Sequence, residues 1–145
     1  KHTIRHKFMN QLSGEEIKYE VEVLDEKITE ITGKKPKFFR PPFIAVNDEM
    51  YDNIKMPFIC GVGCNDWVIE TTVEERIETV LKEARDGVIY LLHDMLRNMN
   101  TVDAMKVFVP KLLERGFEFV TVAQLFEKKG VDIYNPERKL YSVVE

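Results

Sequence analysis

Amphipathic helical patterns alternate with short apolar runs along this chain, and no other feature of the sequence limits the fold as strongly. The clearest helical pattern opens on a capping box formed by Ser13 and Glu16, steps its apolar residues by three and four, and stops at Gly33. The clearest apolar run, residues 88–92, has no polar interruption, which is typical of a strand covered on both faces of a parallel sheet. The alternation predicts an α/β domain built on parallel strands.

The same patterns place the other elements. A short helix is expected after Asn47, and another is expected after a second capping box of Thr72 and Glu75, with its end near Gly87. Two further helices are expected, one over residues 102–115 with a kink or break at Pro110 and one over residues 122–129. Strands are expected over residues 37–39, 57–63 and 117–121. The tail from Val131 is expected to be a peripheral extension, with residues 139–144 as a candidate edge strand.

Composition limits the class of protein. A chain of 145 residues that is 44% hydrophobic can bury one core, so a single domain is expected. The net charge of −4 comes from interspersed acids and bases, which argues against a nucleic-acid or membrane partner. Cys60 and Cys64, if both lie on one strand, are about 13 Å apart and beyond disulfide reach, so two free thiols are expected.

Polar residues at the carboxyl ends of the expected strands are the candidates for chemistry, because a rigid scaffold holds the loops there. All three histidines of the protein fall on this one predicted face. The candidates are Arg40, Asp66, Trp67 and His93, together with His2 and His6 in the expected loop before the first helix.

Each candidate taken alone also has a structural interpretation. The spacing of His2 and His6 can be incidental, and His93 can be a core histidine with satisfied hydrogen bonds. The two prolines after Arg40 can simply stiffen a linker. The order and joint content of the set, rather than any one member, favour a functional site.

Four segments, "HTIRH", "FRPPF", "NDW" and "LLHD", occur in this order between the expected strands and helices. In combination they resemble the second to fifth motifs of the NodB-homology polysaccharide deacetylases, carbohydrate esterase family 4, from His2 to about Leu125. The finer pattern is most similar to clostridial-type acetylxylan esterases and xylan or chitin deacetylases. The resemblance implies a deformed (β/α) barrel, with residues 1–130 as the C-terminal major part of its catalytic domain and residues 131–145 as the extension.

The resemblance also implies a site. One carboxylate with His2 and His6 would hold a divalent metal ion, commonly zinc or cobalt, which activates water and polarises a carbonyl. His93 would be the general acid, with Asp66 fixing its tautomer and supporting its charge. The other implied site residues are Arg40 for orienting the general base, the backbone N–H of Phe43 for the oxyanion, and Leu91, Trp67 and Pro42 for lining the acetyl pocket.

This sequence departs from the family pattern at several positions. The family's first motif supplies the catalytic base and the metal carboxylate from an Asp–Asp pair, and no such pair occurs here. We therefore expect roughly 60 upstream residues, about two βα units, to be absent from this chain. Gly63 stands in place of an aspartate and Cys60 in place of an aromatic residue, while Phe43 and Ile44 replace a tyrosine and a glycine.

The expected function is metal-dependent hydrolysis of O- or N-linked acetyl groups from a polysaccharide such as acetylxylan, chitin or peptidoglycan. One alternative is a catalytically incomplete, carbohydrate-binding relative. Another is an unrelated α/β barrel enzyme for a phosphorylated molecule, which the sparse glycines Gly61 and Gly63 support poorly.

The expected partners are an acetylated glycan and either a separate N-terminal chain with the Asp–Asp motif or a second copy. The resemblance favours a secreted or cell-surface location, and the lack of a visible signal segment leaves a cytoplasmic one open.

Overall fold

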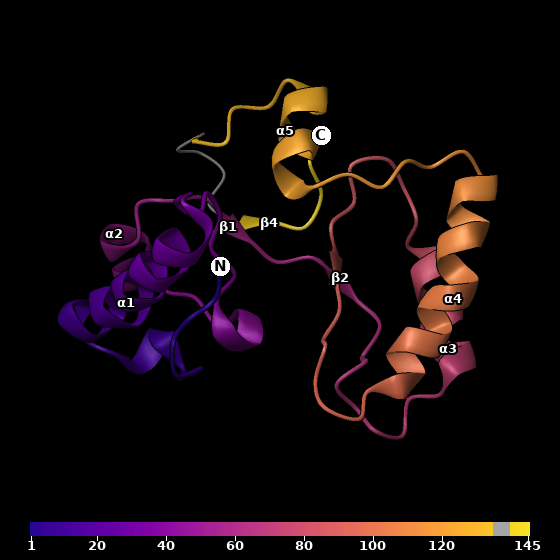
Figure 1. The fold of residues 1–145 in the computed structure, drawn as a ribbon, viewed down its shortest axis with the longest axis horizontal. Coiled ribbons are helices and arrows are strands. Elements are labelled where there is room, and N and C mark those ends of the chain that lie inside the picture. The colour runs from indigo at the N-terminus through magenta and orange to yellow at the C-terminus, as the bar shows by residue number, and fades with distance from the viewer. Residues whose placement is uncertain (135–139) are drawn as a thin grey trace. The chain divides into compact units, whose positions relative to one another are not determined.

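Two units, each with its own core, make up the chain in a computed structural model that describes residues 1–134 and 140–145 (Figure 1). The first unit holds Lys1–Cys60 and the described part of Asp132–Tyr141. The second unit holds Gly61–Val131 and Ser142–Glu145. Among the described residues, no helix combines the length and apolar character that crossing a membrane requires.

The first unit is built around helix α1 (Gly14–Thr32), which follows the short 3-10 helix η1 (Met9–Gln11). The Ser13 hydroxyl accepts from the Glu16 amide at 3.4 Å, and the Glu16 carboxylate accepts from the Ser13 amide at 3.0 Å. At the other end Gly33 has φ +69°, the left-handed conformation that closes a helix and suits glycine. The capping box and the glycine stop confirm the helix expected from the sequence.

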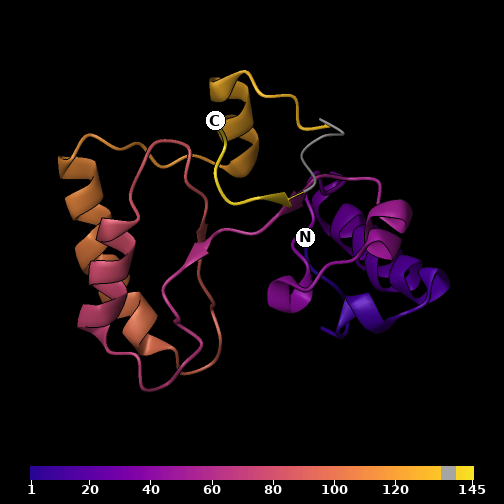
Figure 2. The same ribbon diagram turned by 180° about the vertical axis from the view of Figure 1, so that it is seen from behind.

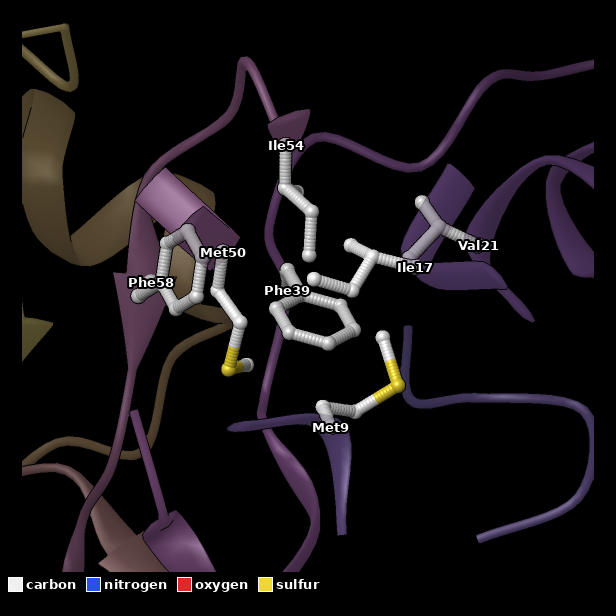
Figure 3. Packing of buried hydrophobic residues seen from close by; sticks show 7 residues of the cluster. All are labelled: Met9, Ile17, Val21, Phe39, Met50, Ile54 and Phe58. Atoms are coloured by element: carbon white, nitrogen blue, oxygen red, sulfur yellow. The ribbon is translucent and has the colours of Figure 1, made fainter. Parts of the chain in front are cut away.

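The core of the first unit packs α1 against helix α2 (Asp48–Asn53) and the chain around Phe39 (Figure 3). The Asn47 side chain caps α2 by accepting from the Met50 amide at 3.0 Å, as the sequence predicts. Burial of each large apolar side chain contributes about 1.5–3 kcal/mol. The buried cluster consists of Met9, Ile17, Val21, Phe39, Met50, Ile54 and Phe58.

Strand β1 (Phe58–Ile59) pairs in parallel with strand β4 (Leu140–Tyr141) inside the first unit. Phe39 forms a single parallel bridge to Phe58. The strand expected over residues 37–39 is therefore reduced to this one bridge. The pairing confirms a strand near the C-terminus, although Lys139, where it was expected to begin, lies outside the described residues. Tyr141 is fully buried, while the domain boundary expected at residue 131 stays a prediction.

In the second unit, strand β2 (Val62–Gly63) pairs in parallel with strand β3 (Tyr90–Leu91). Helices α3 (Val73–Lys82) and α4 (Met99–Glu114) run side by side in both views (Figure 1, Figure 2). Helix α5 (Val122–Lys129) follows, as expected. The core of this unit contains Cys64, Val80, Ala104, Phe108 and Leu112.

Some expected boundaries are wrong in the second unit. Residues 117–121, expected to be a strand, form no ladder, and only two residues of the apolar run 88–92 belong to β3. A strand exists only where a neighbouring backbone accepts and donates hydrogen bonds, and the segment 117–121 finds no such neighbour among the described residues. Helix α3 ends before Gly87, and α4 begins earlier than expected and continues through Pro110 without a break.

Gly87 and the C-terminal residues meet in the second unit. The Val144 amide donates to the Gly87 carbonyl at 2.8 Å, and the Ile89 amide donates to the Ser142 carbonyl at 2.9 Å. Gly87 has φ +84°, and a Cβ at this position would lie 2.0 Å from the Val144 carbonyl oxygen. Only glycine fits this backbone conformation and this close approach.

Among the described residues, Cys60 and Cys64 form no disulfide, as expected from their spacing. Burial raises the pKa of the Cys64 thiol, with the nearby Asp66 carboxylate acting in the same direction. A raised pKa keeps this cysteine in its thiol form, which suits a core residue better than a reactive one.

Candidate functional site

The first candidate cluster lies in the N-terminal segment of the first unit. His2 Nδ1 lies 2.5 Å from the Arg40 carbonyl oxygen, and because a carbonyl only accepts, Nδ1 carries the proton and donates. This tautomer leaves a lone pair on Nε2 of His2. The His6 ring lies edge-on to the His2 ring, with centroids 4.8 Å apart. Two imidazoles in this arrangement can serve as neighbouring ligands of one metal ion.

Burial lowers the pKa of His2 from its ordinary value of 6.5. The hydrogen bond to the Arg40 carbonyl opposes this shift, while the nearby His6 and Arg40 charges add to it. The lowered pKa favours the neutral imidazole at neutral pH, which is the form that binds a metal ion.

Glu20 on helix α1 anchors the segment that carries both histidines. Its fully buried carboxylate accepts from the Arg5 amide at 2.9 Å and from Arg5 Nε at 2.5 Å. The Ile4 amide donates to the Glu20 carbonyl at 3.2 Å. The sequence reasoning missed Glu20, although its position three residues after Ile17 on the apolar face of the helix is a readable signal.

Arg40 and Phe43 flank the histidines. Arg40 donates from Nε to the Cys60 carbonyl at 2.9 Å, and its amide donates to the Lys1 carbonyl at 2.8 Å. Among the described residues, its guanidinium forms no ion pair with a carboxylate. The carboxylate that Arg40 was expected to orient is therefore not supplied by the part of the chain that the structure describes.

Phe43 lies in the 3-10 helix η2 (Pro42–Ile44), where the backbone is strained. Phe43 has φ +57° and Ile44 has φ +54°, a region that side chains, β-branched ones above all, rarely adopt. The Phe43 ring stacks on the Phe8 ring at 3.9 Å and meets the His6 ring edge-on at 4.7 Å. Strain of this kind is retained where surrounding contacts impose it, often at functional sites.

The second candidate cluster lies in the second unit and centres on Asp66 and His93. The His93 ring donates from Nδ1 to Asp66 Oδ1 at 2.8 Å, and the His93 amide donates to Asp66 Oδ2 at 2.6 Å. The Asp66 side chain is fully buried, whereas the His93 side chain is 37% exposed. This arrangement places the proton on Nδ1 and leaves Nε2 for an external partner.

Trp67 and Leu91 lie close to His93 in this cluster. The Trp67 ring meets the His93 ring edge-on, with centroids 5.5 Å apart. Trp67 also packs over Gly63, the strand partner of Leu91, because a Cβ on Gly63 would lie 3.5 Å from the indole. A Cβ at position 63 would thus be in ordinary van der Waals contact with the indole.

Three further polar residues surround Asp66 that the sequence reasoning missed: Arg76, Asn98 and Thr101. Arg76 is 2% exposed and Thr101 is 5% exposed. Arg76 stands four residues before the buried Val80 on helix α3, so its place on the apolar face was the only signal.

The structure thus brings His2, His6, Arg40 and Phe43 together in the first unit and Asp66, Trp67 and His93 in the second. The sharing of one face by all three histidines stays a prediction. A metal ion would find two suitable imidazoles at His2 and His6, but the described residues contain no group of three or more His, Cys, Asp or Glu side chains that could hold one. The histidine pair therefore fits part of a metal site and needs a further ligand.

Comparison with known proteins identifies similar sequences. The family model described as polysaccharide deacetylase matches residues 1–56. The chain is 41% identical over 144 residues to a bifunctional xylanase/deacetylase from Pseudobutyrivibrio xylanivorans, covering 99% of this chain and 24% of that protein. The chain thus spans about a quarter of the length of this curated relative.

Two solved structures are similar over nearly the whole chain. The Xyl-CE4 domain of a multidomain xylanase from the hindgut metagenome of Trinervitermes trinervoides has a TM-score of 0.95 at 42% identity, covering 99% of this chain and 69% of that one. A family 4 acetyl xylan esterase from Clostridium thermocellum, solved with a cobalt ion, has a TM-score of 0.91 at 35% identity, covering 99% of this chain and 70% of that one.

Proposed function

This chain belongs to the polysaccharide deacetylases of carbohydrate esterase family 4, and from this membership we propose that it forms the larger part of a hydrolase that removes acetyl groups from a polysaccharide. The expected α/β fold, part of a deformed (β/α) barrel, is that of the family. The observation that carries the proposal is the histidine pair, in which His2 is held by the Arg40 carbonyl in the tautomer that a metal ligand needs.

A divalent ion such as zinc or cobalt held by His2 and His6 would activate a water molecule and polarise the acetyl carbonyl. The cobalt ion in the structure of the similar acetyl xylan esterase supports a divalent metal ion in the proposed reaction. The neutral state of His2 that burial favours makes the segment ready to bind the ion without first losing a proton.

His93 is proposed to act as the general acid. As the bond between the acetyl carbon and the sugar oxygen or nitrogen breaks, a protonated His93 gives the proton on Nε2 to that leaving atom. The hydrogen bond from Nδ1 to Asp66 holds the ring in place during the transfer. The buried carboxylate also supports the positive charge that the ring carries before the proton leaves.

The remaining residues bind and orient the substrate. The backbone N–H of Phe43 is proposed to donate to the oxygen of the developing tetrahedral centre. Trp67, Leu91 and Pro42 would line the space for the acetyl methyl group. Arg40 would orient the general base by donating hydrogen bonds to its carboxylate.

The reaction needs a general base and a carboxylate ligand that the described residues do not supply at the histidine pair. We therefore include in the proposal an Asp–Asp segment from outside these 145 residues, on the same polypeptide or on a separate chain. The alternative, a carbohydrate-binding relative without catalysis, follows if no such segment completes the site.

Acetylated xylan is the substrate that the comparisons support best, because both similar structures come from proteins named for xylan. Chitin oligomers and peptidoglycan are the competing substrates. A secreted or cell-surface location accompanies this proposal, since these polymers lie outside the cell.

The test is acetate release from acetylated xylo-oligosaccharides and from N-acetylated chito-oligosaccharides, each with and without a chelator. The preparation should contain an Asp–Asp segment, and mass spectrometry should verify its chains. Release that the chelator abolishes would support the proposal and would distinguish ester from amide substrates. Glycan binding without any release would contradict it and favour the binding relative.

A further inference from the structure

We propose that Arg76, Asn98 and Thr101 form a buried network that positions His93 through Asp66. The inference rests on the proposed function, because it assigns these residues to the orientation of the proposed general acid. They are positioning residues, since their contacts reach His93 mainly through the Asp66 carboxylate.

The two oxygens of Asp66 have different partners. Oδ2 accepts from the His93 amide at 2.6 Å, from Thr101 Oγ1 at 3.3 Å and from Asn98 Nδ2 at 3.4 Å. Oδ1 accepts from the His93 ring at 2.8 Å. The three donors on Oδ2 fix the rotation of the carboxylate and thereby direct Oδ1 at the imidazole.

Arg76 supplies a positive charge to this network without an ion pair of its own to Asp66. Its Nη1 donates to Asn98 Oδ1 at 2.6 Å and to Thr101 Oγ1 at 2.6 Å. Asn98 and Thr101 each accept from the guanidinium on one side and donate to the carboxylate on the other. Polarisation along such hydrogen-bond chains strengthens the bonds in a low-dielectric interior.

The rest of Arg76 is held rigidly. Its Nε donates to the Thr71 carbonyl at 3.1 Å, and its Nη2 donates to the Val68 carbonyl at 3.2 Å. A buried guanidinium and a buried carboxylate are both costly unless their hydrogen bonds are satisfied. Here both are satisfied by one network that reaches the half-exposed imidazole of His93.

Asn98 ties the same network to the backbone of His93. Its Nδ2 donates to the His93 carbonyl at 2.9 Å as well as to Asp66. The His93 amide, carbonyl and ring are therefore all fixed by Asp66 and Asn98. The geometry leaves Nε2 as the one polar atom of His93 without a partner in the network, which is the atom that donates the proton in the proposed reaction.

The test compares Thr101→Val, which keeps the volume but removes the hydroxyl, with Thr101→Ser, which keeps the hydroxyl. The matched control is Thr79→Val on helix α3, where the hydroxyl donates only to the Glu75 carbonyl of its own helix. Two measurements are made on the preparation used for the acetate assay, with its metal bound. Steady-state kinetics give kcat and KM, and long-range proton–nitrogen NMR spectra report which ring nitrogen of His93 carries the proton.

Thr101→Val should lower kcat about tenfold, because the Asp66 carboxylate loses one of its hydrogen bonds, with KM and metal content unchanged. It should also weaken the Nδ1–H signature of His93, whereas Thr101→Ser and Thr79→Val should behave like the wild type. A Thr101→Val protein with wild-type kcat and wild-type His93 spectra overturns the inference. If the wild type releases no acetate but Thr101→Val still alters the His93 spectrum, the positioning network stands and the proposed function fails.

Discussion

Replacing Glu20 by Gln should weaken metal binding at a site that Glu20 never touches. The Glu20 carboxylate accepts two hydrogen bonds from Arg5, one from the amide and one from Nε. Gln offers a single acceptor oxygen, so one of the two bonds is lost and an NH₂ group faces a donor. The segment that carries His2 and His6 would then keep one hydrogen bond to the side chain at position 20 and the backbone bond from the Ile4 amide.

The structure sets the size of the effect. A hydrogen bond to a charged group contributes about 1.5–3 kcal/mol, and the lower end applies because the Arg5 side chain is 47% exposed. If the energy of this hydrogen bond no longer helps to hold His2 and His6 in the metal-binding arrangement, the metal affinity falls by about tenfold. Residues that orient metal ligands typically change affinity by about 10- to 100-fold, which agrees with this value.

The assay is calorimetric titration of the metal-free protein with Co²⁺, paired with urea unfolding. Glu26→Gln is the matched control, because Glu26 lies on the exposed side of the same helix and its side chain forms no hydrogen bond or ion pair within the described part of the chain. The reasoning is refuted if Glu20→Gln and Glu26→Gln bind Co²⁺ with the affinity of the wild type. An equal weakening in both variants would also refute it, since the effect would then come from net charge.

Further predictions address the proposed catalytic groups and the fold. His2→Ala should lose both bound metal and acetate release, whereas His93→Ala should keep the metal and lose acetate release. Metal analysis and an acetate assay distinguish the two variants. Loss of metal from His93→Ala would contradict the assignment. Because burial lowers the pKa of His2, protonation of this residue favours the unfolded state. The unfolding free energy should therefore be highest above pH 6.5 and should fall as the pH drops from 6.5 toward the lowered pKa. Urea unfolding at several pH values measures this, and an unchanged slope in His2→Gln would refute it. Ile44→Asn should raise the unfolding free energy by about 1 kcal/mol by relieving a left-handed backbone, and a lower melting temperature would speak against strain there. Met50→Ala should cost about 2–5 kcal/mol because Met50 is fully buried, and a cost below this range in urea unfolding would mean that the core collapses around the space.

The helices of this protein could be predicted from the sequence because their signals are local. The Ser13–Glu16 capping box, the Gly33 stop and the Asn47 cap are each formed by residues within one or two turns of the helix end. The absence of a strand over residues 117–121 could not be predicted, because a strand depends on a partner that is often distant in sequence. Its apolar pattern reports burial and leaves pairing undecided.

The candidate site shows the same division. The histidines and Asp66 could be selected as candidates because their motifs occur in a fixed order. Glu20 and Arg76 were missed because each reads as an ordinary charged residue of a helix until its partner is known. The partner of Glu20 is Arg5, and a partner of Arg76 is Asn98. Only the fold identifies these partners, because it brings them to within hydrogen-bond distance.

Val144 lies so close to Gly87 that the residue type allowed at position 87 depends on the presence of the C-terminal segment. Any side chain at position 87 would collide with the Val144 carbonyl while that segment occupies its place, in addition to the strain that φ +84° imposes on residues other than glycine. Among homologous proteins, a non-glycine residue at this position should therefore occur together with a shortened or rerouted C-terminus. Covariation between the two sites would then mark which relatives close this part of the fold in the same way.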